Sequence, residues 1–110
     1  MSRSQREKGK RTERQAAEQL RDTFGIPARR SVQYCGRAGD ADLQTVPGLH
    51  VEVKARKSIA ALRFHEQATA DAVDGDMPIV LMKEDRSDFY VLIRLQDFPA
   101  VAELLGGTKK

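Results

Sequence analysis

The most constraining feature of this chain is a strict alternation of apolar and polar residues over positions 49–56. The odd-numbered positions are apolar, and the even-numbered positions carry His50, Glu52, Lys54 and Arg56. Because successive side chains of a β-strand point to opposite faces of the sheet, Glu52 and Lys54 must share one face. The segment is therefore predicted to be a strand with one apolar face and one charged face.

A second acidic segment precedes this strand. Asp40 and Asp42 are separated by a single alanine, and the Pro47-Gly48 pair between the two segments is a strong turn signal. A hairpin at that turn would place Asp carboxyl groups beside Glu52 and Lys54. Two or three carboxylates with one ammonium are the groups needed to hold a hard divalent cation and hydrolyse a phosphodiester.

Hydrophobic periodicity and turn signals predict the element order α-β-β-β-α-β-β-α. Helices are expected at about residues 7–24, 59–73 and 96–105, and strands at residues 31–35, 42–46, 49–55, 77–82 and 89–93. Helices that separate groups of strands favour a mixed sheet with helices on its faces. The expected fold class is therefore α/β, with a mixed central sheet of about five strands flanked by helices.

The composition of the 110 residues favours one small intracellular domain. The chain is 40% hydrophobic and 32% charged, and its single cysteine cannot form an internal disulfide, which suits a reducing cytoplasm. The longest apolar run, residues 79–82, is far too short to span a bilayer, and the N-terminus has no apolar signal core. We expect a cytoplasmic protein with one domain over residues 1–110, a loose basic arm at residues 1–7 and a loose tail at residues 106–110.

Positive charge is concentrated in the first thirty residues. They contain nine Lys or Arg residues and four acids, an excess of five positive charges, whereas the whole chain has a net charge of +3. A basic segment on a nearly neutral body indicates a polyanionic partner, because neutralising phosphates releases counterions. A solvated basic tail without a partner is the alternative interpretation.

Glu13 is aligned with the apolar stripe of the first predicted helix. It precedes Ala17 by four residues and Leu20 by seven, which places it on the face expected to pack against the core. Because a buried carboxylate without a partner is costly, Glu13 either belongs to a site or lies in solvated first turns beside a nearby cation.

Other common chemistries find no support in the sequence. His50, His65 and Cys35 lack the spacing of zinc ligands. No Gly-rich loop ending in Lys-Ser/Thr is present, which argues against a nucleotide cofactor, and there is no Gly-x-Ser-x-Gly elbow. His50 shares the Glu52 face, where the pattern favours an ordinary strand histidine over a peripheral role in a site.

The combined pattern resembles the PD-(D/E)XK nuclease superfamily. The residues that carry this resemblance are Lys8-Gly9, Glu13-Arg14, Asp42, Glu52-Val53-Lys54 and Gln67. The resemblance covers roughly residues 8–94 and is closest to small archaeal-type Holliday junction resolvases and short phage-type endonucleases. Ala41 stands where the family usually has a proline before its first acid, so Asp40 is an alternative to Asp42.

The resemblance implies a restriction-endonuclease-like fold and a metal-dependent site. The catalytic residues would be Glu13, Asp42, Glu52, Lys54 and Gln67. The cofactor would be Mg²⁺, with Mn²⁺ as a substitute, held by Asp42, Glu52, the Val53 carbonyl and Glu13. Lys54 would orient or help deprotonate the attacking water, or offset charge on the phosphate. Gln67 would steady the site by hydrogen bonding, or would be an ordinary surface residue.

The activity implied by the resemblance is metal-dependent DNA endonuclease activity, most like that of a Holliday junction resolvase from a bacterium, archaeon or phage. The candidate DNA contacts are Lys8, Lys10, Arg11, Arg14, Arg29, Arg30, Arg37 and Arg56. Two symmetric incisions favour a homodimer, formed through the last helix or residues 89–93. No membrane partner is expected. The alternatives are a nuclease that nicks or trims other DNA, and a non-catalytic basic DNA-binding module.

Overall fold

A computed structural model describes residues 3–31 and 41–106 of the chain. The elements are α1 (Arg3–Phe24), β1 (Arg29–Arg30), β2 (Leu43–Gln44), β3 (Leu49–Arg56), α2 (Ala61–Asp71), β4 (Met77–Glu84), β5 (Tyr90–Leu92), a 3₁₀ turn η1 (Leu95–Asp97) and α3 (Phe98–Leu104). The predicted order of helices and strands is confirmed. No helix within these described residues is long and apolar enough to cross a membrane.

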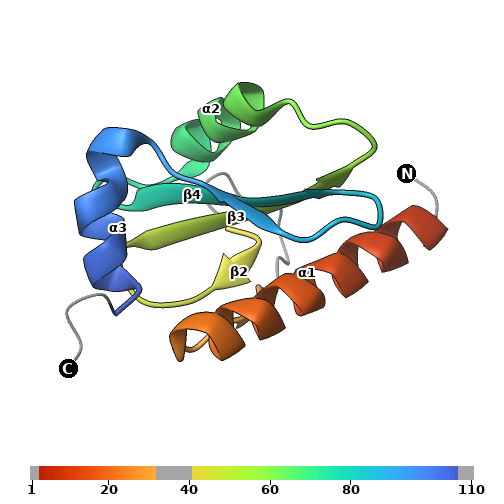
Figure 1. Ribbon diagram of the computed structural model, residues 1–110, viewed down its shortest axis with the longest axis horizontal. Helices are drawn as coiled ribbons and strands as arrows, with labels where there is room; N and C mark the ends of the chain where they lie inside the picture. Colours follow the sequence, from red (N-terminus) through yellow and green to blue (C-terminus); the bar gives the residue numbers. More distant parts are fainter. Residues whose placement is uncertain (1–2, 32–40, 107–110) are drawn as a thin grey trace.

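The five strands form one mixed sheet in the order β1-β2-β3-β4-β5. Strands β3 and β4 are parallel over eight residue pairs, from Leu49 opposite Met77 to Arg56 opposite Glu84, and the other neighbours are antiparallel. A parallel pair needs a crossover connection, which α2 supplies. Figure 1 shows α2 on one side of the sheet and α1 on the other. The predicted α/β fold with a mixed five-stranded sheet is confirmed.

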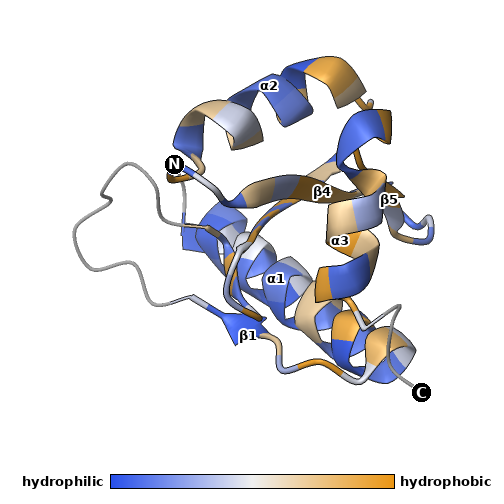
Figure 2. Ribbon diagram, turned by 90° about the vertical axis from the view of Figure 1, so that its left-hand side faces the viewer, coloured by the Kyte–Doolittle hydropathy of each residue, from blue (hydrophilic) through white to orange (hydrophobic). Residues whose placement is uncertain are grey.

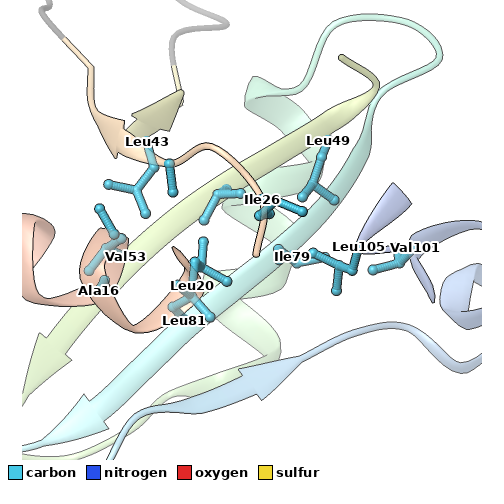
Figure 3. Packing of buried hydrophobic residues seen from close by; sticks show 13 residues of the cluster. Ala16, Leu20, Ile26, Leu43, Leu49, Val53, Ile79, Leu81, Val101 and Leu105 are labelled. Atoms are coloured by element: carbon cyan, nitrogen blue, oxygen red, sulfur yellow. The ribbon is translucent and has the colours of Figure 1, made fainter. Parts of the chain in front are cut away.

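The larger hydrophobic core lies between the sheet and helices α1 and α3. Figure 3 shows Leu20 of α1 and Val101 of α3 packing against Val53, Ile79 and Leu81 of the central strands. Figure 2 shows that the three helices form two layers, with α1 and α3 together on one side and α2 alone on the other. The face of the sheet toward α1 and α3 is the one that carries the apolar residues of the predicted alternation.

A smaller apolar cluster lies between the sheet and α2. It consists of Phe64, Ala68 and Val80, with partly buried neighbours such as Met82. Val80 pairs with Glu52 in the parallel ladder, so the polar residues of β3 lie on this α2 side of the sheet. The charged face of the predicted strand is therefore covered by a helix rather than left to solvent.

Strand β2 is shorter than predicted. It contains Leu43–Gln44 instead of the expected residues 42–46, and just before its start the backbone N–H of Val53 donates to the side chain of Asp42 rather than to a strand carbonyl. Strand β1 is Arg29–Arg30. The strand predicted over residues 31–35 lies, beyond Ser31, outside the described residues.

Helix α1 begins at Arg3, earlier than the predicted start near Glu7. Residues 3–7, expected as part of a loose arm, are therefore helical. Two ion pairs accompany this first part of the helix: Lys10 Nζ lies 3.7 Å from Glu7 Oε2 one turn away, and Lys8 Nζ lies 3.5 Å from Asp85 Oδ1 after β4. The Lys10–Glu7 pair has i, i+3 spacing, which favours the helical state modestly.

Candidate active site

Two carboxyl groups meet where β2 begins beside β3. Leu43 pairs with Val51 in an antiparallel register, which places Asp42 opposite Glu52. Asp42 Oδ2 accepts a 2.8 Å hydrogen bond from the backbone N–H of Val53, and the negative charge of Glu52 acts on Asp42 at close range. Glu52 is 4% exposed. The structure thus brings together the two acids expected to bind a cation.

Crowding of these acids changes the protonation of Asp42. Burial, followed by the negative charge of Glu52, raises the pKa of Asp42 to about 7, although the Val53 N–H acts in the opposite direction. The charge of Glu13 raises the pKa of Asp42 further. A cation bound among these carboxyl groups would relieve their mutual repulsion, so the electrostatics of the site fit a metal ion.

Glu13 reaches the same region from α1. Its Oε1 accepts a 2.9 Å hydrogen bond from Nε of Arg30 in β1. Burial raises the pKa of Glu13, the Arg30 guanidinium lowers it, and the charge of Glu52 raises it again. The partner required for a carboxylate on this helix face is therefore Arg30, a residue that we predicted as a DNA contact.

Lys54 follows Glu52 by two residues in β3 and is half-buried. Its Nζ is 5.8 Å from the centroid of the Phe64 ring in α2, and the guanidinium carbon of Arg56 is also 5.8 Å from that centroid. Such cation–π contacts orient a cationic side chain without removing its charge. Phe64 therefore brings α2 into contact with Lys54, which the sequence pattern did not indicate.

Several of these residues line one groove of about 660 Å³, whereas Glu52 and Phe64 are not among its lining residues. Its walls include Glu13, Asp42, Val53 and Lys54, together with basic side chains from α1, β1 and β3: Arg6, Lys8, Lys10, Arg30 and Arg56. A larger hollow of about 810 Å³ lies along the β1–β2 edge, but the described residues that line it include no acid. The smaller groove is therefore the better candidate for an active site.

The remaining predicted site residues either do not line this groove or lie outside the described residues. Gln67 is an exposed residue of α2 and is not among the residues that line the groove. Arg11 and Arg14 are exposed on α1, and Arg29 Nε donates a 2.9 Å hydrogen bond to Gln44 Oε1 at the sheet edge. Arg37 and the alternative acid Asp40 lie outside the described residues. The functional role of each stays a prediction.

His50 is placed differently from an ordinary strand histidine. It is 2% exposed, and its Nε2 lies 2.8 Å from Glu52 Oε1. The sequence pattern gave one signal for this contact, because the alternation placed His50 on the same face as Glu52. It could not show that α2 covers this face. An exposed histidine would have water as its hydrogen-bond partner instead of Glu52.

The donor set fits a cation that keeps much of its water. Among residues 3–31 and 41–106, no group of three His, Cys, Asp or Glu side chains is placed to hold a metal ion. Mg²⁺ typically binds through one or two carboxylates and retains several waters, whereas zinc requires more protein ligands. Asp42 and Glu52 supply this smaller number.

These features define the class of metal-dependent nucleases in which an acid on one strand is followed by Glu-x-Lys on the next. Residues 4–108 match the family described as "Phage putative PDDEXK endonuclease". The chain therefore belongs to this family and to the PD-(D/E)XK superfamily, whose members generally use divalent metal ions and act on DNA.

The fold is also similar to a solved structure, that of Archaeoglobus fulgidus Hjc, a Holliday junction resolvase from an archaeal hyperthermophile. The similarity has a TM-score of 0.57 at 24% sequence identity and covers 90% of this chain and 96% of that one. It establishes the restriction-endonuclease-like fold. No curated protein matches the chain.

Proposed function

We propose that this protein is a single-domain, cytoplasmic DNA endonuclease that depends on Mg²⁺, with Mn²⁺ as a substitute, and resolves Holliday junctions. The observation that carries the proposal is the pair of half-buried Asp42 and buried Glu52 beside Lys54, next to a groove that Asp42, Glu13 and Lys54 line together with several basic side chains. A purely structural sheet would gain nothing from two carboxyl groups that repel each other inside it.

Asp42 and Glu52 would hold the cation through carboxylate oxygens, with the Val53 carbonyl as a third donor. When bound, a divalent cation polarises the scissile phosphate and lowers the pKa of water. Asp42 keeps its orientation through the Val53 N–H and must lose its proton before it can act as a ligand. Glu13 would act from α1 by holding a water or a second cation, once Arg30 turns to the DNA.

Lys54 would act on the attacking water and the phosphate. As a cation it cannot join the ligands, but it shares a strand face with Glu52 and lines the groove. Its ammonium would orient the water for in-line attack or offset the negative charge that grows on the phosphate. The Phe64 ring limits the positions that this ammonium can take.

The basic side chains around the groove would bind the DNA backbone. Lys8 and Lys10 line the groove, and Arg30 and Arg56 flank the acid pair. The ion pairs of Lys8 with Asp85 and of Lys10 with Glu7 are exposed and weak enough to be exchanged for phosphate contacts. Exposed Arg11 and Arg14 extend the positive surface along α1.

Junction resolution is supported by the similarity in fold to the archaeal resolvase, whose length this chain nearly matches. Paired incisions require two active sites, which a homodimer provides. The exposed apolar side chains of β5 and α3 would form the dimer surface, since Tyr90 and Phe98 are 66% and 54% exposed. A family member that nicks or trims other DNA is the second candidate function, favoured by the family match.

The proposal is tested by offering the purified protein a synthetic four-way junction and a linear duplex of the same sequence, with Mg²⁺. Symmetric paired cuts confined to the junction would support resolution, and equal cutting of both substrates would favour the second candidate. A chelator should stop cleavage, and Mg²⁺ or Mn²⁺ should restore it. Light scattering of the protein in solution tests the dimer.

Two variants separate a nuclease from a non-catalytic DNA-binding module. Glu52→Ala and Lys54→Ala should each abolish incision while junction binding is retained, because neither residue is needed to hold the DNA backbone. If the wild-type protein binds the junction but cuts no DNA with either cation, the chain is a binding module and the proposed activity is wrong.

A further inference from the structure

The buried hydrogen bond between His50 and Glu52 lies next to the proposed cation ligands. His50 Nε2 and Glu52 Oε1 are 2.8 Å apart, and the two side chains are 2% and 6% exposed. Both residues belong to β3, which pairs with β4 along its whole length, so their backbone positions are well determined. A contact this deep cannot be replaced by water without opening the α2 layer.

The role proposed for Glu52 sets the direction of this hydrogen bond. A carboxylate that binds a cation is ionised and can only accept, so His50 would donate from Nε2 when Glu52 acts as a ligand. The donated bond fixes the rotation of the Glu52 carboxylate about its own axis.

We propose that His50 is a positioning residue for Glu52, holding its carboxylate in the orientation in which it binds a divalent cation together with Asp42. This inference rests on the proposed function, because it takes Glu52 to be a ligand. Partners that orient a metal ligand in this way typically change metal affinity by about 10- to 100-fold when they are removed. A histidine with only a packing role would leave the cation affinity of the folded protein unchanged.

The test is Mn²⁺ binding to the DNA-free protein, measured by calorimetry or electron paramagnetic resonance. His50→Met fills a similar volume without an N–H, and we expect it to bind Mn²⁺ about 10- to 100-fold more weakly. His50→Gln can place an amide N–H near the position of Nε2, and we expect it to recover most of the affinity. Thermal unfolding of each variant shows that it is folded.

His65→Met is the matched control. His65 is the other histidine of the sequence, lies on α2 within 3.4 Å of Thr69 Oγ1, and does not line the groove. Its substitution should leave Mn²⁺ affinity at the wild-type value. If His50→Met also binds Mn²⁺ with wild-type affinity, the positioning role is wrong.

Glu52→Gln, measured in the same assay, separates the two proposals. If Glu52→Gln binds Mn²⁺ as well as the wild type does, the proposed ligand set fails. If Glu52→Gln loses binding and His50→Met keeps it, only the positioning role fails. Should His50→Met not fold, ¹⁵N spectra of the wild type decide: His50 must be protonated on Nε2 with and without Mg²⁺, and protonation on Nδ1 alone would overturn the inference.

Discussion

The two faces of β3 are buried to a similar degree but contribute different things to the protein. Val51 and Val53 face a cluster of 13 buried apolar residues within the described chain. On the other face, Glu52 and His50 are also nearly inaccessible, but the apolar cluster beside them contains only three buried residues. One face therefore supplies most of the hydrophobic stabilisation, and the other holds buried charge.

This difference shows how a small domain accommodates a strained site. Burying apolar surface contributes about 25 cal/mol per Å², whereas burying interacting carboxylates opposes folding. The raised pKa of Asp42 is the sign of that opposition. The α1 and α3 side of the sheet must offset it, which is a common relation between stability and activity in enzymes. Substitutions on the two faces should therefore have separable effects.

The largest expected effect is on the charged face. Lys54→Met keeps the stem that packs against Phe64 but removes the ammonium, so we expect cleavage to slow by about 10³-fold, roughly 4 kcal/mol of transition-state stabilisation. Single-turnover cleavage measures the rate, and thermal unfolding should change little. A Lys54→Met protein that cleaves at the wild-type rate would contradict the role assigned to Lys54.

The next effect is on the apolar face. Ile79 is fully buried in the larger cluster, and Ile79→Ala should destabilise the protein by about 3 kcal/mol because it leaves a cavity. Urea unfolding measures this loss, and cleavage at low temperature should remain. Leu62→Ala is the matched control, since Leu62 is 77% exposed on α2 and should change stability by less than about 0.5 kcal/mol.

A smaller effect of opposite sign is expected at the acid pair. The unfolded carboxyl of Asp42 ionises near pH 3.8 and the folded one near 7, so wild-type stability should fall as pH rises between these values. Asp42→Asn removes this loss and should be about 2 kcal/mol more stable than wild type at pH 8 without divalent cations. Urea unfolding at pH 4 and pH 8 measures the difference.

At pH 4 the advantage of Asp42→Asn should be much smaller, because the folded wild-type carboxyl is then protonated and the unfolded one, with a pKa of 3.8, has only begun to gain from ionisation. The same variant should lose the stabilisation that added Mg²⁺ gives the wild type. A variant that is less stable than wild type at pH 8 would show that repulsion between the acids does not strain the fold.

The smallest effect on stability is expected at the surface. Lys8→Ala breaks an exposed ion pair with Asp85, so stability should change by less than about 1 kcal/mol. DNA binding should weaken, and the slope of log affinity against log salt should decrease by about one, because one phosphate contact is lost. Binding measured over a salt series tests this, and an unchanged slope would remove Lys8 from the DNA surface.

Much of the fold follows from local patterns. The period of two over residues 49–56, the Pro47-Gly48 turn and the helical stripe of α1 correctly predicted the order of elements and the shared face of Glu52 and Lys54. The element ends were less accurate, as at β2, which begins only after Asp42, where the side chain of Asp42 replaces a strand carbonyl as the acceptor for the N–H of Val53. That replacement depends on a contact across eleven residues, which no local propensity reports.

The candidate site was indicated by the sequence in part. The pattern singled out the acids and Lys54 for roles that stay predictions, and the structure brings Asp42, Glu52 and Glu13 into electrostatic contact. Gln67 was chosen as the α2 contribution, whereas the α2 residue found beside Lys54 is Phe64. Phe64 and Gln67 are about one helical turn apart. Which of them lies beside Lys54 depends on the rotation of α2 about its axis, and that rotation is set by packing against the sheet.

By itself the sequence determined which side chains share a face of β3, because the alternation of a strand is a property of the backbone. The tertiary structure decided what those side chains meet. The placement of α2 buries His50 against Glu52, and the approach of α1 to β1 pairs Glu13 with Arg30. These contacts join residues through the packing of whole layers, and their strength depends on burial that no spacing in the chain encodes.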